Sequence, residues 1–476
     1  ADEGIAQQVS PAPKAFPGRS PHHTPDGHPA DDDPVGRRFV PPMQLPPSPP
    51  GLEALMERRA ADEEAVGGLT LDALLSLATQ NNPTLVQAQQ QVNGTLGKAI
   101  EAGLWPNPTV FYVAEQIFVD APNDTDTPGE FQGAQIQQEI VTAHKRRLSR
   151  QKYLARSRTA EWLCVAQQWK VCNDVRIHFW ETVGHRMIVD QRRELLKSAE
   201  DVAVTARELY NLGQATRADL HMSNVQIQRT RLDLLAAENM YRSQFGILTS
   251  LVGMEMPPQP LSGELDKGVE VAIDFDTALS RIVSESPEIL AARAKWQADN
   301  ITLERERVEP IPNIFVKGGA GYNFESREPV AVAQIFLDIP IFDRNQGTIR
   351  QAEADLIRQQ AEIRRTELFL RQELARVYQD YVTALQHVME FDAVILPESR
   401  AAYVNQLDAY KEDRQNWGDV LDAQRNYFDL RRQYIAHLVT WRRNEVLISG
   451  YLLHGGLDAA PNPTPPGHID AVAQPR

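Results

Sequence analysis

Residues 69–89 read LTLDALLSLATQNNPTLVQAQ, and residues 273–293 read IDFDTALSRIVSESPEILAAR. Both stretches carry an acidic residue in an apolar pattern near their start, and both reach a proline fourteen positions after their first residue. Two further pairs keep nearly the same offset: QIQQEIV from Gln135 with QIFLDIP from Gln334, and the segment from Tyr210 with the segment from Tyr410. A repeated unit of roughly 190 residues is far longer than the units of solenoid proteins. The chain is therefore two copies of one large unit.

The two copies share one internal order. A helix leads to a proline-rich break, WPNP from Trp105 in the first copy and EPIPN from Glu309 in the second. Two strand-like segments, a very long helix, a short turn and a long return helix follow. We place the first structural repeat at residues 67–260 and the second at residues 261–455.

Both ends of the chain are rich in proline. Residues 1–50 hold 13 of the 32 prolines, a composition that does not build a packed core. We expect residues 1–66 to be a largely disordered arm and residues 456–476 a disordered tail. The opening residues, ADEGIAQQVS, lack a secretory signal, so either a leader was removed or the protein is cytosolic.

The long helices carry a seven-residue apolar repeat, which indicates packing against neighbouring helices. In the second copy its members are Ile349, Leu356, Ile363, Leu370, Val377, Ala384 and Phe391. The return helix repeats it at Val420, Tyr427, Tyr434, Trp441 and Ile448. A helix from Lys145 to Tyr210 would run about 100 Å, whereas Pro397 should kink its counterpart.

Strand-like segments alternate apolar and polar residues. The clearest lie in the second copy, at Ile314, Val316, Gly318, Ala320, Tyr322 and Phe324, and at Ala331, Ala333, Ile335, Leu337, Ile339 and Ile341. Each is about as long as a tilted membrane strand, but a half-buried soluble sheet gives the same pattern. Four strands cannot close on themselves, and lipid tolerates no open sheet edge. If the strands lie in a membrane, several protomers must pool them.

Bulk properties exclude several classes of function. A formal net charge of -15 argues against nucleic-acid binding. Cys164 and Cys172 stand eight apart on one expected helix, about 12 Å, too far for a disulfide, and their spacing fits no zinc motif. P-loop, HExxH, CxxC and nucleophile-elbow motifs are all missing, so we expect no enzyme, no cofactor and no metal site.

The order of elements, together with several motifs, resembles the TolC-like outer-membrane efflux protein family over about residues 69–453. The motifs are the LTLDAL opening with NNPTL and ESPEI, the WPNP and IPN breaks, DIPIFDRNQG, LGQATRADL and GDVLDAQRNYF. Singly they are weak, but in this order and twice over they are specific. They are most similar to the branch that serves cobalt-zinc-cadmium and copper efflux.

The resemblance implies a mainly α fold with a small membrane β part. Long coiled-coil helices of three protomers would form an α-barrel through the periplasm, and four strands per protomer would form a 12-stranded β-barrel in the outer membrane. It also implies a homotrimer that contacts outer-membrane lipid, a periplasmic adaptor and an inner-membrane pump of the resistance-nodulation-division type. The channel would be a passive exit duct, with heavy-metal cations as candidate cargo.

The family's site residues carry over to the hairpin tips. Its D-x-x-D pore motif matches Asp419 and Asp422 of GDVLDA. Adaptor-contact residues would be those that flank the two tip turns: Leu212, Gly213, Arg217, Asp413 and Arg414. The second turn departs from the family's glycine-rich pattern, because KEDRQ occupies residues 411–415. This departure weakens the assignment of the adaptor contact there.

The residues themselves support a pore-facing role for the aspartates. Asp419 and Asp422 are three apart, so they share one helix face, while Val420 and Tyr427 belong to the seam against a neighbour. The aspartates then face water, which in a tube is the inner side. Helix capping is the alternative; it explains Asp419 well and Asp422 poorly.

Two other functions fit parts of the chain. A soluble coiled-coil adaptor or scaffold of the envelope would use the heptads without the strands. A periplasmic metal-binding protein would use the N-terminal arm, where His22, His23 and His28 precede Asp31–Asp33.

Overall fold

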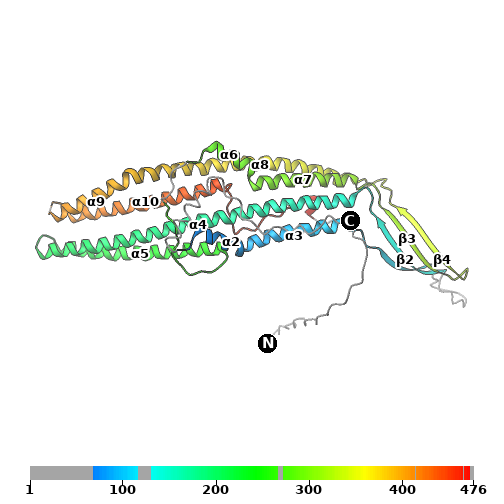
Figure 1. The fold of residues 1–476 in the computed structure, drawn as a ribbon, viewed down its shortest axis with the longest axis horizontal. Helices are drawn as coiled ribbons and strands as arrows, with labels where there is room; N and C mark the ends of the chain where they lie inside the picture. Colours follow the sequence, from blue (N-terminus) through cyan, green and yellow to red (C-terminus); the bar gives the residue numbers. More distant parts are fainter. Residues whose placement is uncertain (1–67, 116–129, 266–271, 413, 465, 472–476) are drawn as a thin grey trace, which may run out of the picture. The chain divides into compact units, whose positions relative to one another are not determined.

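The computed structural model describes residues 68–115, 130–265, 272–412, 414–464 and 466–471 (Figure 1). The arm predicted for residues 1–66 lies outside the described residues. The elements run α2 (Leu71–Asn81), α3 (Pro83–Gly103), β1 (Thr109–Glu115), β2 (Phe131–Ile140), α4 (Lys145–Asn211), α5 (Arg217–Val252), α6 (Phe275–Glu285), α7 (Pro287–Val308), β3 (Ile314–Asn323), β4 (Glu328–Leu337), α8 (Gln346–Glu390), the π-helix η1 (Phe391–Ile395), α9 (Leu396–Lys411), α10 (Trp417–Ser449) and η2 (Ile469–Ala471).

The first helix of each copy is two helices, which corrects the expectation of one. α2 stops before Pro83 and α6 stops before Pro287, because a residue that precedes proline disfavours the helical conformation. Proline then occupies the first turn of α3 and of α7, where its missing N–H costs nothing. The Asn82 side chain caps α3 by accepting a hydrogen bond of 2.9 Å from the Thr84 amide.

The long helices bury the predicted heptad. α4 is continuous over 67 residues, about 100 Å, and packs against α5 and α10. In α8 the heptad residues Leu370, Val377 and Ala384 are buried. Near the start of α8, Ile349 and Leu356 are half-buried and pack against an apolar cluster of Leu303, Ala352 and Ile469. Asp355 and Gln359 are buried on the same helix, so the interior there is partly polar. Cys164 and Cys172 are buried and free, as expected.

A π-helix interrupts the path that leads from α8 to α9. It covers Phe391–Ile395 and is followed at once by Pro397 in the first turn of α9. Proline offers no N–H and its ring crowds the preceding turn, so the chain widens there by one residue per turn. A break at this proline was predicted, but its form was not.

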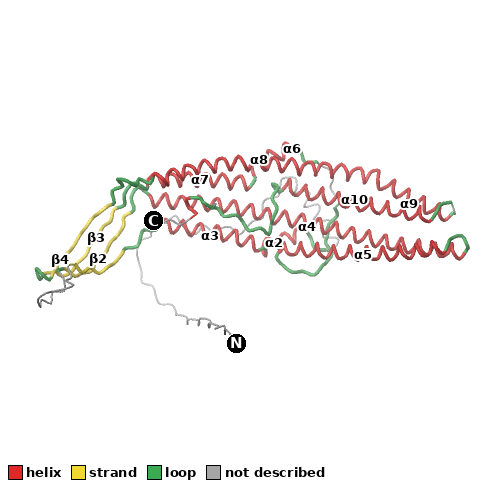
Figure 2. Tube along the Cα trace, turned by 180° about the vertical axis from the view of Figure 1, so that it is seen from behind, coloured by secondary structure: helices red, strands yellow, loops and turns green. Residues whose placement is uncertain are grey.

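The four strands form one antiparallel sheet in chain order, β1-β2-β3-β4 (Figure 2). The central pair, β2 and β3, comes from different copies and places Ala134 opposite Ala320. A side chain at Gly321 would meet the Phe131 ring, so glycine is needed where these strands approach closely. Within the described sheet, β1 and β4 are the edges.

The edge strands expose large apolar side chains. Val110 and Tyr112 on β1 are about two-thirds exposed, and Ile335 on β4 is 74% exposed. Exposure continues beyond β4 to Phe342, which is 90% exposed. Such a patch on one chain marks a surface that meets lipid or another protein. Among the described helices, none combines the length and apolar character that crossing a membrane requires.

The prediction of a disordered tail after residue 456 is wrong for its described part. Gly456 accepts hydrogen bonds from Thr84 and Gln167, and His468 and Ile469 are buried. The proline-rich composition allows this because the tail docks as an extended segment on α3 and α4 and needs no core of its own. Its last turn, η2, enters the polar interior beside α8.

Candidate functional site

Two hairpin turns lie at the same end of the helices, opposite the strands (Figure 1). In the first, between α4 and α5, Gly213 adopts a left-handed φ of 78°. The Gln214 amide donates to the Leu209 carbonyl at 2.8 Å, which closes the end of α4. This turn exposes Leu212 at 73%, and Gly213 and Arg217 are exposed with it.

The second turn, between α9 and α10, is charged. The Arg414 amide donates to the Ala409 carbonyl at 2.9 Å, and the Arg414 side chain pairs with Glu412. Both side chains are exposed. Asp413, the remaining residue predicted here, lies outside the described residues.

An apolar cluster joins the two hairpins beneath their turns. Trp417, at the position that Arg217 has in the first copy, is buried against Tyr410 with ring centroids 5.1 Å apart. Val202 and Ala206 of α4 belong to the same cluster. The substitution of tryptophan for arginine at this position therefore anchors the second turn on the first hairpin.

Asp419 and Asp422 lie side by side on the outer face of α10 in the protomer. Both are exposed, whereas Val420 between them is buried at 1%. The side chain of Asp422 is 79% exposed and lies 3.5 Å from Arg425. The helix thus turns its apolar side to the cluster and its carboxylates to solvent, as the sequence predicts.

Comparison of the two copies tests whether Asp419 is a capping residue. In the first copy, Asp219 accepts a hydrogen bond of 2.8 Å from the Thr216 amide and completes a capping box. In the second copy, Asn416 stands at the cap and α10 has no side-chain cap bond. A hydrogen-bonded cap is therefore present at Asp219 and not at Asp419, which nevertheless lies in the first turn of α10, where its charge suits the helix dipole.

Arg425 is a site residue that the sequence reading missed. Besides its ion pair with Asp422, it donates a hydrogen bond of 3.0 Å to Gln226 of α5. It therefore links the aspartate face of α10 to the first hairpin. Its position three residues after Asp422 was a usable signal, since such pairs meet on a helix surface.

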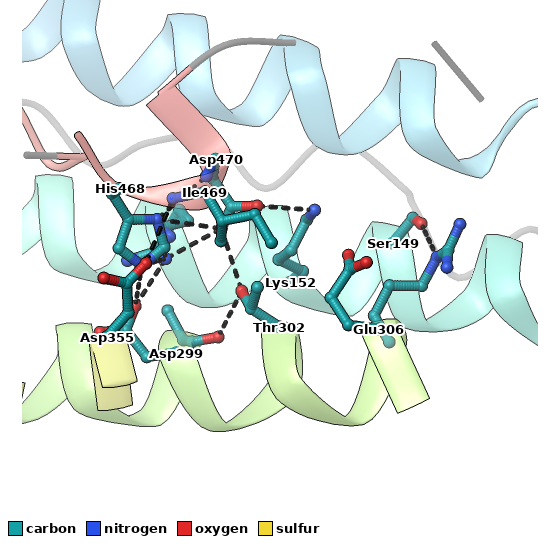
Figure 3. Close-up of polar contacts among 12 residues, drawn as sticks. Ser149, Lys152, Asp299, Thr302, Glu306, Asp355, His468, Ile469 and Asp470 are labelled. Atoms are coloured by element: carbon teal, nitrogen blue, oxygen red, sulfur yellow. Dashed lines mark hydrogen bonds and ion pairs between the residues drawn. The ribbon is translucent and has the colours of Figure 1, made fainter. Parts of the chain in front are cut away.

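A second polar site lies inside the protein and was missed entirely (Figure 3). Arg156 of α4 is 1% exposed; its Nη2 lies 2.6 Å from Asp299 of α7 and 2.9 Å from Asp470 of η2. Lys152 donates to the other Asp470 oxygen at 2.9 Å, and Thr302 donates to Asp470 at 3.0 Å. We call this set, with His468 and Asp355, the buried charge cluster.

Histidine and carboxylates meet in the same cluster. The Nε2 atom of His468 lies 3.0 Å from Asp299, and the Ile469 amide donates to Asp355 at 3.2 Å. Burial alone would raise the pKa of Asp470, but Lys152 and Arg156 lower it to about 2. Within the described residues, no three histidine, cysteine or carboxylate side chains are arranged to hold a metal ion. The arrangement binds the tail to α4, α7 and α8.

Several known proteins resemble this chain along most of its length. The cobalt-zinc-cadmium resistance protein CzcC of Cupriavidus metallidurans is 27% identical over 383 residues, which cover 79% of this chain and 88% of CzcC. The CusC channel superposes with a TM-score of 0.64 at 17% identity over 81% of this chain and 92% of CusC.

The open-state MtrE outer membrane channel of Neisseria gonorrhoeae superposes with a TM-score of 0.61 at 18% identity, covering 82% of this chain and 90% of MtrE. No protein-family model matches. At these TM-scores the chain shares its fold with both channels. The chain is therefore similar in sequence to a cobalt-zinc-cadmium resistance protein and similar in fold to the CusC and MtrE channels.

Proposed function

We propose that the chain is the outer-membrane component of a tripartite system that exports heavy-metal cations. The observation that carries the cargo is the likeness to a cobalt-zinc-cadmium resistance protein along 88% of that protein's length. Proteins of the TolC-like family, which the chain resembles, are channels and not enzymes, so we propose that the chain conducts and does not transform its cargo. We also propose an outer-membrane location, supported by the likeness in fold to the OprN and MtrE outer membrane channels, which would disfavour the soluble scaffold alternative.

Family members are trimers, and we propose one particular trimer for this chain. The edges β1 and β4 would pair between protomers, so that three copies pool twelve strands. The long helices of three copies would line one tunnel. The exposed apolar residues on β1 and β4 support this assembly, because they have no cover within one protomer.

We further propose that Asp419 and Asp422 form the acidic constriction of that tunnel. Threefold symmetry would bring three copies of each carboxylate around one axis. Close carboxylates attract and concentrate cations, the chemistry of acidic rings in cation channels. The support is their exposure in the protomer, together with the absence of a capping bond at the start of α10.

The turns would meet the other two components of the system. We propose that Leu212, Gly213 and Arg217 of the first turn contact a periplasmic adaptor, and that Arg414, with Asp413, contributes from the second. The adaptor would connect the channel to an inner-membrane pump of the resistance-nodulation-division type. Exposed Leu212 gives such a contact an apolar anchor.

Single-channel recording of Asp419→Ala/Asp422→Ala tests the constriction. We expect divalent and trivalent cations to block the variant only at roughly tenfold or higher concentration, because the local accumulation of counter-ions is lost. Asp219→Ala is the matched control, since this aspartate at the equivalent first-copy position serves as a cap. Unchanged block in the double variant, with the trimer intact, would rule out the acidic constriction.

The cargo is tested in cells. A strain that keeps a cobalt-zinc-cadmium pump and adaptor but lacks its outer-membrane component should regain tolerance to these metals when this chain is expressed. If expression of this chain restored tolerance to organic toxicants but not to these metals, the chain would serve another kind of pump and the proposed cargo would be wrong.

A further inference from the structure

The two copies differ at the middle of their long helices. α4 passes without interruption from the sheet to the first turn. The equivalent path in the second copy contains the π-helix Phe391–Ile395 followed by Pro397. Helix breaks of this kind are points at which a long helix bends. The second hairpin, which carries Asp419 and Asp422, therefore has a bending point that the first hairpin lacks.

A pair of histidines spans this bending point. His387, in the last turn of α8, places its Nδ1 atom 3.2 Å from Nε2 of His437 on α10. The two rings meet edge to face with centroids 4.4 Å apart, and the Phe391 ring lies 5.4 Å from the His437 ring. Three rings therefore pack together: His387 from α8, His437 from α10 and Phe391 from the π-helix.

The titratable group that acts on the His437 ring is His387, which lies on the neighbouring helix α8. On α10, the residues one turn from His437 are uncharged: Gln433, Tyr434, Thr440 and Trp441. On α8 and the π-helix, Glu390 and Asp392 are the nearest acidic residues in sequence, and both point to solvent as exposed side chains. The pKa of His437 is lowered by burial and then by His387, so the packed contact favours the uncharged ring.

We propose that His387 and His437 form a proton-sensitive latch across the π-helix. Uncharged, the two rings hold α8 against α10 and keep the second hairpin straight. When both take up protons, two imidazolium ions 3.2 Å apart repel each other and the latch opens. The hairpin formed by α9 and α10 then swings about the π-helix, while the first hairpin stays in place.

The direction of the pH response follows from the linkage between proton binding and the stability of the packed state. A histidine whose pKa is lowered in the packed state stabilises that state at high pH and destabilises it as protons bind. The latch should therefore be closed above about pH 7 and open within about pH 5–6, where histidine clusters usually switch. Only the consequence for conduction, a wider constriction in acid, rests on the function proposed above.

Spin labels on the two turns test the latch directly. Labels at Gln214→Cys and Gln415→Cys report the distance between the hairpins by pulsed EPR, in detergent-purified trimers diluted with unlabelled chain. The native Cys164 and Cys172 do not compete, because both are buried and burial raises the pKa of each to about 11. We expect this distance to increase and broaden when the pH falls from 7.5 to 5.5.

Two variants and one control separate the latch from simple packing. His387→Gln/His437→Gln should abolish the pH response, and His387→Lys/His437→Lys should give the acid distances at pH 7.5. His221→Gln is the control, since this exposed histidine lies on the first hairpin away from the latch. An acid response that persists in the double Gln variant, or no response in the unmodified protein, would overturn the proposal. The distances need neither cargo nor current, so this outcome is independent of the conduction tests.

Discussion

At the scale of residues, Asp470 anchors the docked tail through buried ion pairs. Its two oxygens accept hydrogen bonds from Lys152, Arg156 and Thr302, all in the interior. Removing one partner of a buried ion pair leaves a charge uncompensated and costs about 3–5 kcal/mol. We expect Asp470→Asn to lower the melting temperature of the purified protein markedly. Asp458→Asn, an exposed tail control, should shift stability by less than about 0.5 kcal/mol.

The difference in stability between the unmodified protein and Asp470→Asn should change with pH in a definite direction. The pKa of Asp470 falls from 3.8 to about 2 in the folded protein, so its stabilisation is complete above pH 3.8 and is lost as the pH falls toward 2. The shift corresponds to about 2 kcal/mol. The gap in melting temperature between the unmodified protein and Asp470→Asn should stay constant above pH 4 and narrow below it. A gap that persists undiminished to pH 2 would contradict the ion-pair account.

Residue-level prediction succeeded where local geometry decides and failed where distant segments meet. The exposure of Asp419 follows from its spacing to Asp422 and from the apolar seam at Val420. The burial of His468 depends on Arg156 and Asp299, which lie on α4 and α7 more than 150 positions away. A proline-rich composition contains no information about such a docking site.

At the scale of elements, the first hairpin turn depends on one backbone conformation. Gly213 has φ 78°, and no atom lies within 4 Å of the place where a Cβ would stand. Gly213→Ala should therefore cost only the left-handed backbone penalty, about 1–2 kcal/mol, seen as a lower melting temperature. Gly246→Ala, in the interior of α5 and equally open, should instead stabilise by about 0.5–1 kcal/mol. Equal destabilisation of both variants would contradict this account, because only Gly213 has a left-handed backbone conformation.

Element-level prediction worked best for the long helices. The heptad residues Leu370, Val377 and Ala384 are buried because a seven-residue period is written locally in the sequence. The breaks before Pro83 and Pro287 were equally readable, since a cap residue precedes each proline, but were read as one continuous helix. The π-helix before Pro397 was beyond prediction, because a kink and a π-turn share the same sequence signal.

At the scale of the whole molecule, the four-stranded sheet of the described protomer has two edges, β1 and β4, without a neighbouring strand. The strands expose apolar side chains along both edges, and lipid tolerates no unpaired backbone. The sequence predicted the strands and the need for several protomers, because strand count and closure are matters of geometry. It did not predict that β2 and β3 bring the two copies together at the centre of the sheet, since register between distant segments is a tertiary property.

The last prediction uses the alternation of the edge strand. Ile335 on β4 is 74% exposed and belongs to its apolar face, whereas Gln334 points to the opposite face. If the apolar face meets lipid in the trimer, Ile335→Lys buries a charge in hydrocarbon at a cost of about 2–4 kcal/mol. We expect a reduced yield of detergent-stable trimer in the outer-membrane fraction, measured by native mass. Gln334→Lys, one position away, is the control and should assemble more readily, because its side chain is already polar and lies on the face opposite Ile335. If both variants assemble equally well, the apolar face of β4 does not contact lipid, and the proposed pooling of strands would need revision.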